Sequence, residues 1–183
     1  VYQDDAFGKA GLKSAQGAFE RQGVKPAIEA SIDMNKLEAL GPTVDKVKQT
    51  QPGAIIMVTA GKASTAFIRE YLKTGQRPQF FGVSVLSAKA LLGELDSAAH
   101  GIVIAQVVPS PLRTSYGISK EFLAAAKKSD SKDVTYNSLE GYLTAKVFVE
   151  ALRRAGKDLS RDKLFTALES LNNIDLGGFI VDY

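Results

Sequence analysis

The chain has 183 residues, of which 45% are hydrophobic and 23% are charged, and this balance is typical of a globular protein rather than a disordered or fibrous one. The length suits one domain and is short for two. The formal net charge of +3 comes from dispersed basic residues, so no basic cluster indicates a nucleic-acid partner. With no cysteine and a single histidine, the sequence offers no disulfide, no thiolate nucleophile and no Cys- or His-based metal site. We therefore expect no cofactor and favour binding over catalysis.

The first half of the chain alternates strand-like and helix-like segments. The expected strands cover residues 1–3, 27–32, 54–59, 79–85 and 101–108. The expected helices cover residues 7–22, 43–49, 64–73 and 88–95. This alternation predicts an α/β fold with a doubly wound parallel sheet, right-handed crossovers and helices on both faces. The run at 54–59 is continuously apolar, which predicts a strand covered on both faces.

The pattern changes after residue 108. Pro109 and Pro111 interrupt regular structure, three helices follow, and only residues 178–183 look extended. The apolar stripes of these helices are Ile118, Phe122, Leu123 and Ala126, then Tyr142, Ala145, Phe148, Val149 and Leu152, then Leu164, Phe165, Leu168 and Leu171. Ser160 is a suitable N-cap for the third helix. The three helices carry more apolar surface than they can bury on one another, so we expect them to pack on a second sheet encoded upstream, although helices from another chain would also cover them.

Motifs that carry enzyme chemistry are missing. Asp4 and Asp5 follow the first strand, as in magnesium-binding receiver domains, but Thr59 and Ala60 stand where such a domain needs a third aspartate, so we expect the pair to cap the following helix. The glycines of residues 7–11 and 61–64 do not complete a phosphate-binding loop. Nothing resembles the nucleophile motif of a serine hydrolase, and His100 is expected in a surface loop.

The carboxyl ends of the strands remain as the candidate site, because ligands of open parallel sheets bind there. The segments at this edge are residues 4–7, 33–35, 59–62, 84–87 and 107–110. They are small, polar and lightly charged, and Phe7 is the one aromatic residue among them. Phe7 is expected either to contact a ligand or to pack against its own helix as a hydrophobic staple.

Several segments resemble a known family. They are the opening VYQDDAFG, residues 51–56, 79–82, 101–103 and 107–109, the helix at 141–152, and residues 176–182. Together they resemble type I periplasmic binding proteins, and among these the leucine/isoleucine/valine-binding-protein-like receptors that serve ABC importers. The resemblance extends from end to end of the chain.

The resemblance implies an organisation in two lobes that clamp a ligand. Residues 1–108 would form most of lobe two, residues 109–111 a hinge, residues 112–175 helices packing on lobe one, and residues 176–183 a third crossover. Pro109, Pro111 and Gly177 would be the hinge residues. The sheet of lobe one and a signal peptide would lie upstream, and the protein would be periplasmic.

The resemblance also implies ligand contacts at Phe7, at Ala60 with the neighbouring Gly61, and at Ser84. Phe7 matches an aromatic contact of the family, whereas Ala60 stands in place of a second aromatic. Ser84 stands where amino-acid receptors have a carboxylate for the ligand's ammonium group, and a hydroxyl cannot balance a buried cation. An aromatic or aliphatic carboxylate, or an amide, is therefore as good a ligand as an amino acid.

The implied function is non-enzymatic substrate binding for an ABC importer, with a small-molecule ligand and the importer's membrane subunits as partners. An effector-sensing domain of a transcriptional or cytoplasmic regulator with the same fold is the alternative. A Rossmann-type enzyme is a further alternative, and it would need the nucleotide motif that these residues lack.

Overall fold

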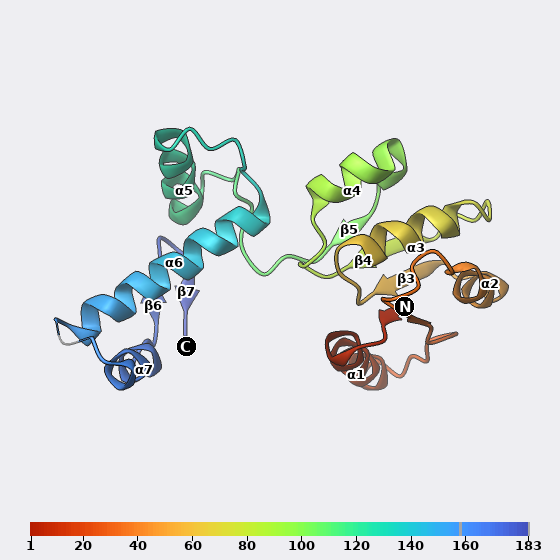
Figure 1. Ribbon diagram of the computed structural model, residues 1–183, viewed down its shortest axis with the longest axis horizontal. Helices are drawn as coiled ribbons and strands as arrows, with labels where there is room; N and C mark the ends of the chain where they lie inside the picture. The colour runs from red at the N-terminus through yellow and green to blue at the C-terminus, as the bar shows by residue number, and fades with distance from the viewer. Residues whose placement is uncertain (158, 183) are drawn as a thin grey trace. The chain divides into compact units, whose positions relative to one another are not determined.

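The computed structural model describes residues 1–157 and 159–182. The chain divides into two compact units, Val1–Ala105 and a second unit that begins at Gln106 (Figure 1). Length alone favours one domain, but each unit gathers around buried clusters of its own. No helix in the described part of the chain is long and apolar enough to cross a membrane.

The strands of the first unit are all parallel. They are β1 (Tyr2–Gln3), β2 (Ser31–Ile32), β3 (Ala54–Met57), β4 (Gln79–Gly82) and β5 (Val103–Ile104). One group pairs β1 with β2, and the other runs β3-β4-β5. A parallel bridge between Tyr2 and Val58 joins the two groups, so the strands follow the order β2-β1-β3-β4-β5. The predicted parallel α/β fold is confirmed.

Helices cover both faces of these strands. They are α1 (Ala6–Arg21), α2 (Gly41–Gln49), α3 (Lys62–Leu72) and α4 (Ala88–Leu95), and the short 3-10 helix η1 (Asp96–Ala99) follows α4. Helices α2, α3 and α4 share a buried cluster with Ile55, Met57 and Phe80 of the strands. Helix α1 lies on the opposite face, where Gly11 meets the side chain of Val58 (Figure 1).

Several strands are shorter than their apolar runs predict. Of the expected strand at 27–32 only Ser31–Ile32 forms, because its partner β1 offers just two residues for pairing. Of the expected strand at 101–108 only Val103–Ile104 forms, because this edge strand pairs with the last two residues of β4. Strand β4 itself stops at Gly82, since the chain then turns and the Leu86 amide donates to the Val83 carbonyl at 2.9 Å.

The prediction that residues 54–59 are covered on both faces is wrong for the first part of this run. Ile55 and Met57 are buried, whereas Ile56 is 42% exposed. Phe81 and Val103 on the neighbouring strands are 38% and 46% exposed. Helix α1 packs beside β1, as the contact of Gly11 with Val58 shows, and leaves these apolar positions of β3, β4 and β5 open among the described residues.

The second unit contains the three predicted helices and a small antiparallel hairpin. Its elements are α5 (Gly117–Lys128), α6 (Tyr136–Ala155), α7 (Arg161–Glu169), β6 (Ile174–Asp175) and β7 (Ile180–Val181). The Ser160 hydroxyl accepts the Lys163 amide at 3.3 Å, so the predicted N-cap of α7 is confirmed. Strand β6 was not predicted, and β7 falls in the segment expected to be extended, whose last residue, Tyr183, lies outside the described residues.

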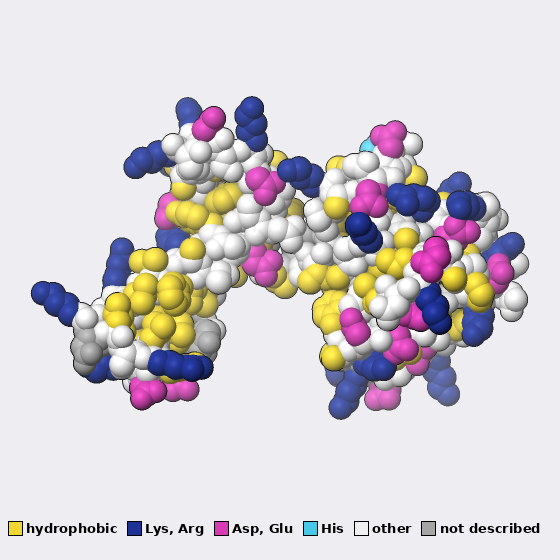
Figure 2. All heavy atoms as spheres, viewed as in Figure 1, with side chains coloured by type: hydrophobic (Ala, Val, Ile, Leu, Met, Phe, Trp, Pro, Cys, Tyr) yellow, Lys and Arg dark blue, Asp and Glu magenta, His cyan; other side chains and the backbone are white. Residues whose placement is uncertain are grey.

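The predicted apolar stripe of α6 is largely on its uncovered side. The side chains that α6 buries are Leu139, Leu143 and Ala151. Phe148 and Val149 are 47% and 44% exposed. Figure 2 shows apolar side chains gathered over α6 and α7. The excess of apolar surface expected from the sequence is therefore present on the described helices. Because α6 has apolar residues on its exposed side as well, the sequence pattern predicted the wrong side of the helix as buried.

Candidate functional site

The parallel register brings three predicted site segments to one edge of the first unit. Met57 at the end of β3 pairs with Gly82 at the end of β4, so the residues that follow both strands lie at the same edge. Ala60 and Gly61 connect β3 to α3, and Ser84 follows β4. Phe7 lies in the first turn of α1, directly after β1.

Helix α1 begins at this edge with a side-chain cap. Asp5 is the N-cap, and its Oδ1 accepts the Gly8 amide at 2.9 Å. Asp4 pairs instead with Lys9, at 2.7 Å between Oδ1 and Nζ. This side-chain hydrogen bond raises the pKa of Lys9. The predicted capping role is confirmed for Asp5, while Asp4 is held by an exposed ion pair.

Phe7 is 41% exposed and takes part in none of the buried clusters of the first unit. The structure therefore favours a ring that faces solvent or a ligand over a hydrophobic staple. Its neighbour Gly8 is buried against Gln3, and a Cβ on Gly8 would come within 1.8 Å of the Gln3 carbonyl oxygen. This close approach brings the first turn of α1, and Phe7 with it, directly against the end of β1.

The other predicted contacts are neutral. Ala60 and Ser84 are half-buried, and the Ser84 hydroxyl makes no hydrogen bond with another residue in the described chain. Gly61 has a φ of 53° and precedes α3 without a side-chain cap. Behind this loop Thr59 and Ser64 are buried, with their hydroxyl oxygens 2.8 Å apart. Ala60, Gly61 and Ser84 therefore place small, uncharged groups at this edge of the strands.

The carboxylates at this edge already have partners. Asp4 and Asp5 are engaged as described above, and Asp33 accepts the Asn35 amide at 2.9 Å and pairs with Lys36 at 3.6 Å. Lys62, the first residue of α3, is exposed and has no ion-pair partner among the residues that the structure describes. Within the same described residues no group of three or more His, Asp and Glu side chains is placed to hold a metal. Lys62 is therefore the charged side chain at this edge that has neither a hydrogen bond nor an ion pair among the described residues.

One buried residue of this edge was not singled out from the sequence. Gln3 is 6% exposed and its carboxamide contacts both Asp5 and Ala60. A polar side chain at the end of a strand, directly before two aspartates, is the only sequence signal that pointed to it.

A profile of the periplasmic binding protein family matches residues 1–182. The chain belongs to the periplasmic binding protein family. No curated protein sequence matches this chain.

Solved structures place this periplasmic binding protein among the type I, leucine/isoleucine/valine-binding-protein-like receptors. A substrate-binding periplasmic protein from Ralstonia solanacearum is 31% identical with a TM-score of 0.87, and the match covers 99% of this chain and 52% of that one. A possible leucine/isoleucine/valine-binding protein from Rhodopirellula baltica is 26% identical with a TM-score of 0.85, covering 96% and 49%. A fatty acid ABC transporter substrate-binding protein from Thermomonospora curvata shares the fold, with 24% identity, a TM-score of 0.80 and coverage of 97% and 46%. The chain thus spans about half the length of the solved structures that it matches.

The expected hinge residues of this periplasmic binding protein lie in its second unit, in two segments that are hydrogen-bonded to α5. Ser119 of α5 is buried, and its hydroxyl donates to the Ser110 carbonyl, between Pro109 and Pro111, at 2.9 Å. The Gly177 carbonyl accepts the Ile118 amide, also at 2.9 Å. Both segments are thus tied to the start of the same helix, and their role as hinges stays a prediction.

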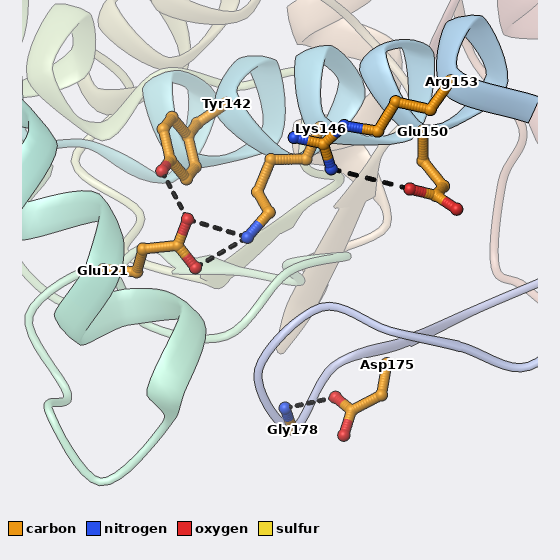
Figure 3. A network of polar contacts seen from close by, with 7 residues as sticks. All are labelled: Glu121, Tyr142, Lys146, Glu150, Arg153, Asp175 and Gly178. Atoms are coloured by element: carbon orange, nitrogen blue, oxygen red, sulfur yellow. Dashed lines mark hydrogen bonds and ion pairs between the residues drawn. The ribbon is translucent and has the colours of Figure 1, made fainter. Parts of the chain in front are cut away.

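A polar network joins α5 to α6 in the second unit (Figure 3). Glu121 accepts hydrogen bonds from Lys146 Nζ at 2.6 and 2.7 Å and from the Tyr142 hydroxyl at 2.8 Å. The hydrogen bond from Lys146 lowers the pKa of Glu121. Burial, with the hydrogen bond to Glu121, raises the pKa of Tyr142 to about 12. These groups face one another, so the network stabilises the packing of the two helices.

Replacing Tyr142 with Phe is expected to lower the free energy of unfolding by about 1 kcal/mol at neutral pH, because one hydrogen bond to Glu121 is lost. Neutral Tyr142 is favoured by the fold, so its contribution is complete below pH 10.0 and is lost as the pH rises toward about 12. Glu121 contributes above its unfolded pKa of 4.5 and less as the pH falls below that value. Urea unfolding of both proteins between neutral and alkaline pH measures the difference.

Tyr116→Phe is the matched control, because the Tyr116 ring lies against Arg113 and its hydroxyl has no hydrogen bond among the described residues. We expect this variant to keep the wild-type stability at neutral pH. A Tyr142→Phe protein as stable as the control would contradict a stabilising role for the network.

Proposed function

We propose that this chain is part of the substrate-binding component of an ABC importer and that it captures a small carboxylic acid without catalysing a reaction. Membership of the periplasmic binding protein family and the likeness to a substrate-binding periplasmic protein support the binding role. The protein would work in the periplasm and deliver its ligand to the importer's membrane subunits. Residues 1–108 would belong to lobe two and residues 112–175 to lobe one, with Pro109, Pro111 and Gly177 as hinge residues.

The observation that carries the proposal is the combination of an exposed ring and satisfied carboxylates at the edge of the first unit. Phe7 offers an apolar surface, and Ala60 beside Gly61 leaves room for a bulky group. Ser84 provides a hydroxyl that has no partner among the described residues. Ser84 cannot supply a counter-charge to a ligand's ammonium group, and a buried charge without such a partner is costly.

The side chains that are not already engaged favour an acid over an α-amino acid. Asp4, Asp5 and Asp33 are engaged with other groups, whereas Lys62 has no ion-pair partner in the described part of the chain. A carboxylate on an aromatic or aliphatic body would match both the positive charge and the apolar ring of Phe7. The similar protein from Thermomonospora curvata is a fatty acid ABC transporter substrate-binding protein, which is compatible with this class.

Thermal unfolding with single compounds tests the proposal. Benzoate and octanoate represent the acids, phenylalanine and leucine the amino acids, and benzamide the amides. A ligand present at about 100 times its dissociation constant stabilises the protein by roughly 2.7 kcal/mol. We expect benzoate or octanoate to raise the melting temperature and the amino acids to leave it unchanged. A shift with leucine or phenylalanine alone would contradict the assigned ligand class, and no shift with any compound would contradict the proposed site.

Phe7→Ala is expected to weaken binding of the responsive acid by about tenfold, which corresponds to about 1.4 kcal/mol. Because Phe7 lies outside the buried clusters, the stability of the free protein should stay within about 0.5 kcal/mol of wild type. Phe81→Ala is the matched control, since Phe81 is 38% exposed but is part of strand β4 rather than of a segment that follows a strand. Titration calorimetry measures the affinities, and equal losses in the two variants would contradict a ligand contact at Phe7.

A further inference from the structure

We infer that Gln3 is a positioning residue that holds the two proposed ligand-contact loops, the start of α1 with Phe7 and the β3–α3 loop with Ala60, in a fixed relation. This inference rests on the proposed function for its consequence in binding. Its structural part, the coupling of the two loops, stands on contacts within the first unit alone.

The Gln3 side chain contacts both loops at once. Its Nε2 donates to Asp5 Oδ2 at 2.6 Å, and its Oε1 accepts the Ala60 amide at 3.0 Å. The side chain is 6% exposed, so water does not readily replace either partner. Its backbone is fixed as well, because the Gln3 amide donates to the Val58 carbonyl at 3.1 Å.

A carboxamide meets both hydrogen-bonding requirements of this position. Asp5 can only accept a hydrogen bond when it is ionised, and the Ala60 amide can only donate one. A group between them must donate on one side and accept on the other, and Gln does both. An apolar side chain of the same length would leave the Ala60 amide without its partner.

The Asp5 carboxylate passes the constraint on to α1. Its Oδ2 is held by Gln3, while its Oδ1 caps the helix at the Gly8 amide at 2.9 Å. Phe7 lies between these two anchored residues. On the other side Ala60 directly precedes Gly61, the N-cap of α3. A change at Gln3 is therefore felt at both proposed contact loops, although neither Phe7 nor Ala60 is altered.

The test compares Gln3→Met with Gln76→Met. Methionine keeps an unbranched side chain but can make neither hydrogen bond. Gln76 also joins two segments, since it accepts the Tyr71 hydroxyl at 2.6 Å and donates to the Lys48 carbonyl at 3.2 Å. It follows the end of α3 and precedes β4, so it lies at the opposite edge of the strands.

In Gln3→Met we expect the Ala60 amide to exchange with solvent about tenfold faster, measured by amide NMR, with chemical-shift changes at both Phe7–Gly8 and Ala60–Gly61. Affinity for benzoate or octanoate, whichever the wild type binds, should fall about fivefold, while Gln76→Met keeps the wild-type affinity. Unchanged exchange at Ala60, shifts on one loop alone, or an affinity equal to wild type would overturn the inference.

Two further conditions allow the test to be interpreted if the first variant does not fold or if no acid binds. If Gln3→Met does not fold, Asp5→Ser replaces it, because Ser keeps an N-cap for α1 but removes the carboxylate oxygen that accepts the Gln3 carboxamide. Chemical-shift changes are then expected at Ala60–Gly61 as well as at Phe7–Gly8, and changes at Phe7–Gly8 alone would overturn the inference. If the wild type binds neither acid, the proposed ligand class fails, and the amide shifts alone then decide whether Gln3 couples the two loops.

Discussion

Replacing Gly8 with Ala is expected to lower the free energy of unfolding by about 3 kcal/mol, because the added methyl group has no space. A Cβ at this position would lie 1.8 Å from the Gln3 carbonyl oxygen and 2.8 Å from the Gln3 carbonyl carbon. Both atoms are backbone, so relief requires α1 to move away from β1 rather than a side chain to rotate. Urea unfolding monitored by circular dichroism measures the loss.

Two glycines of the same helix provide the comparison. At Gly17 a Cβ would meet only the Arg21 side chain, at 3.5 Å, so Gly17→Ala should stabilise α1 by about 0.5–1 kcal/mol through helix propensity. At Gly11 a Cβ would lie 2.2 Å from Val58 Cγ1, a side-chain atom that can shift, so Gly11→Ala should fall between the two. If Gly8→Ala were as stable as Gly17→Ala, the close packing of α1 on β1 would be contradicted.

Features set by local chemistry were predicted well from the sequence. The caps at Asp5 and Ser160 depend on a side chain reaching an amide three residues ahead, which sequence spacing reveals directly. The alternation of strands and helices is similarly a property of consecutive residues, and it was enough to predict the parallel α/β fold.

Features that depend on residues far away in the sequence were not predicted correctly. Strand lengths depend on how many residues a neighbouring strand offers, which the apolar runs at 27–32 and 101–108 do not record. In α6 apolar residues occur on more than one side, so spacing alone could not separate buried Leu143 from exposed Phe148. Whether a helix covers a given face of a strand, as at exposed Ile56, likewise depends on how the whole unit packs rather than on the strand's own sequence.

The candidate site also contains residues that the sequence revealed and residues that it did not. Phe7 could be singled out because an aromatic residue at the end of a strand is conspicuous, and its exposure agrees with that choice. Gln3 could not, because its two side-chain contacts join residues 2 and 57 positions away in sequence. The ligand-contact roles of Phe7, Ala60, Gly61 and Ser84 stay predictions.

Replacing Gly177 with Ala is expected to destabilise the second unit by about 3 kcal/mol, for two reasons that act together. Gly177 and Gly178 have φ values of 85° and 83° and form the tight turn between β6 and β7, in which the Leu176 amide donates to the Phe179 carbonyl at 2.9 Å. A Cβ on Gly177 would also lie 2.8 Å from the Ile118 amide nitrogen, which donates to the Gly177 carbonyl.

Gly178→Ala separates these two causes. Its φ is nearly the same, but a Cβ there would meet nothing within 4 Å, so only the backbone strain of about 1 kcal/mol should remain. Urea unfolding gives the two free energies, and amide exchange at Ile118 reports whether its hydrogen bond to Gly177 survives. Faster exchange at Ile118 is expected in Gly177→Ala and not in Gly178→Ala. Equal losses in both variants would mean that turn conformation alone matters, and that the hairpin does not buttress the start of α5 through this close approach.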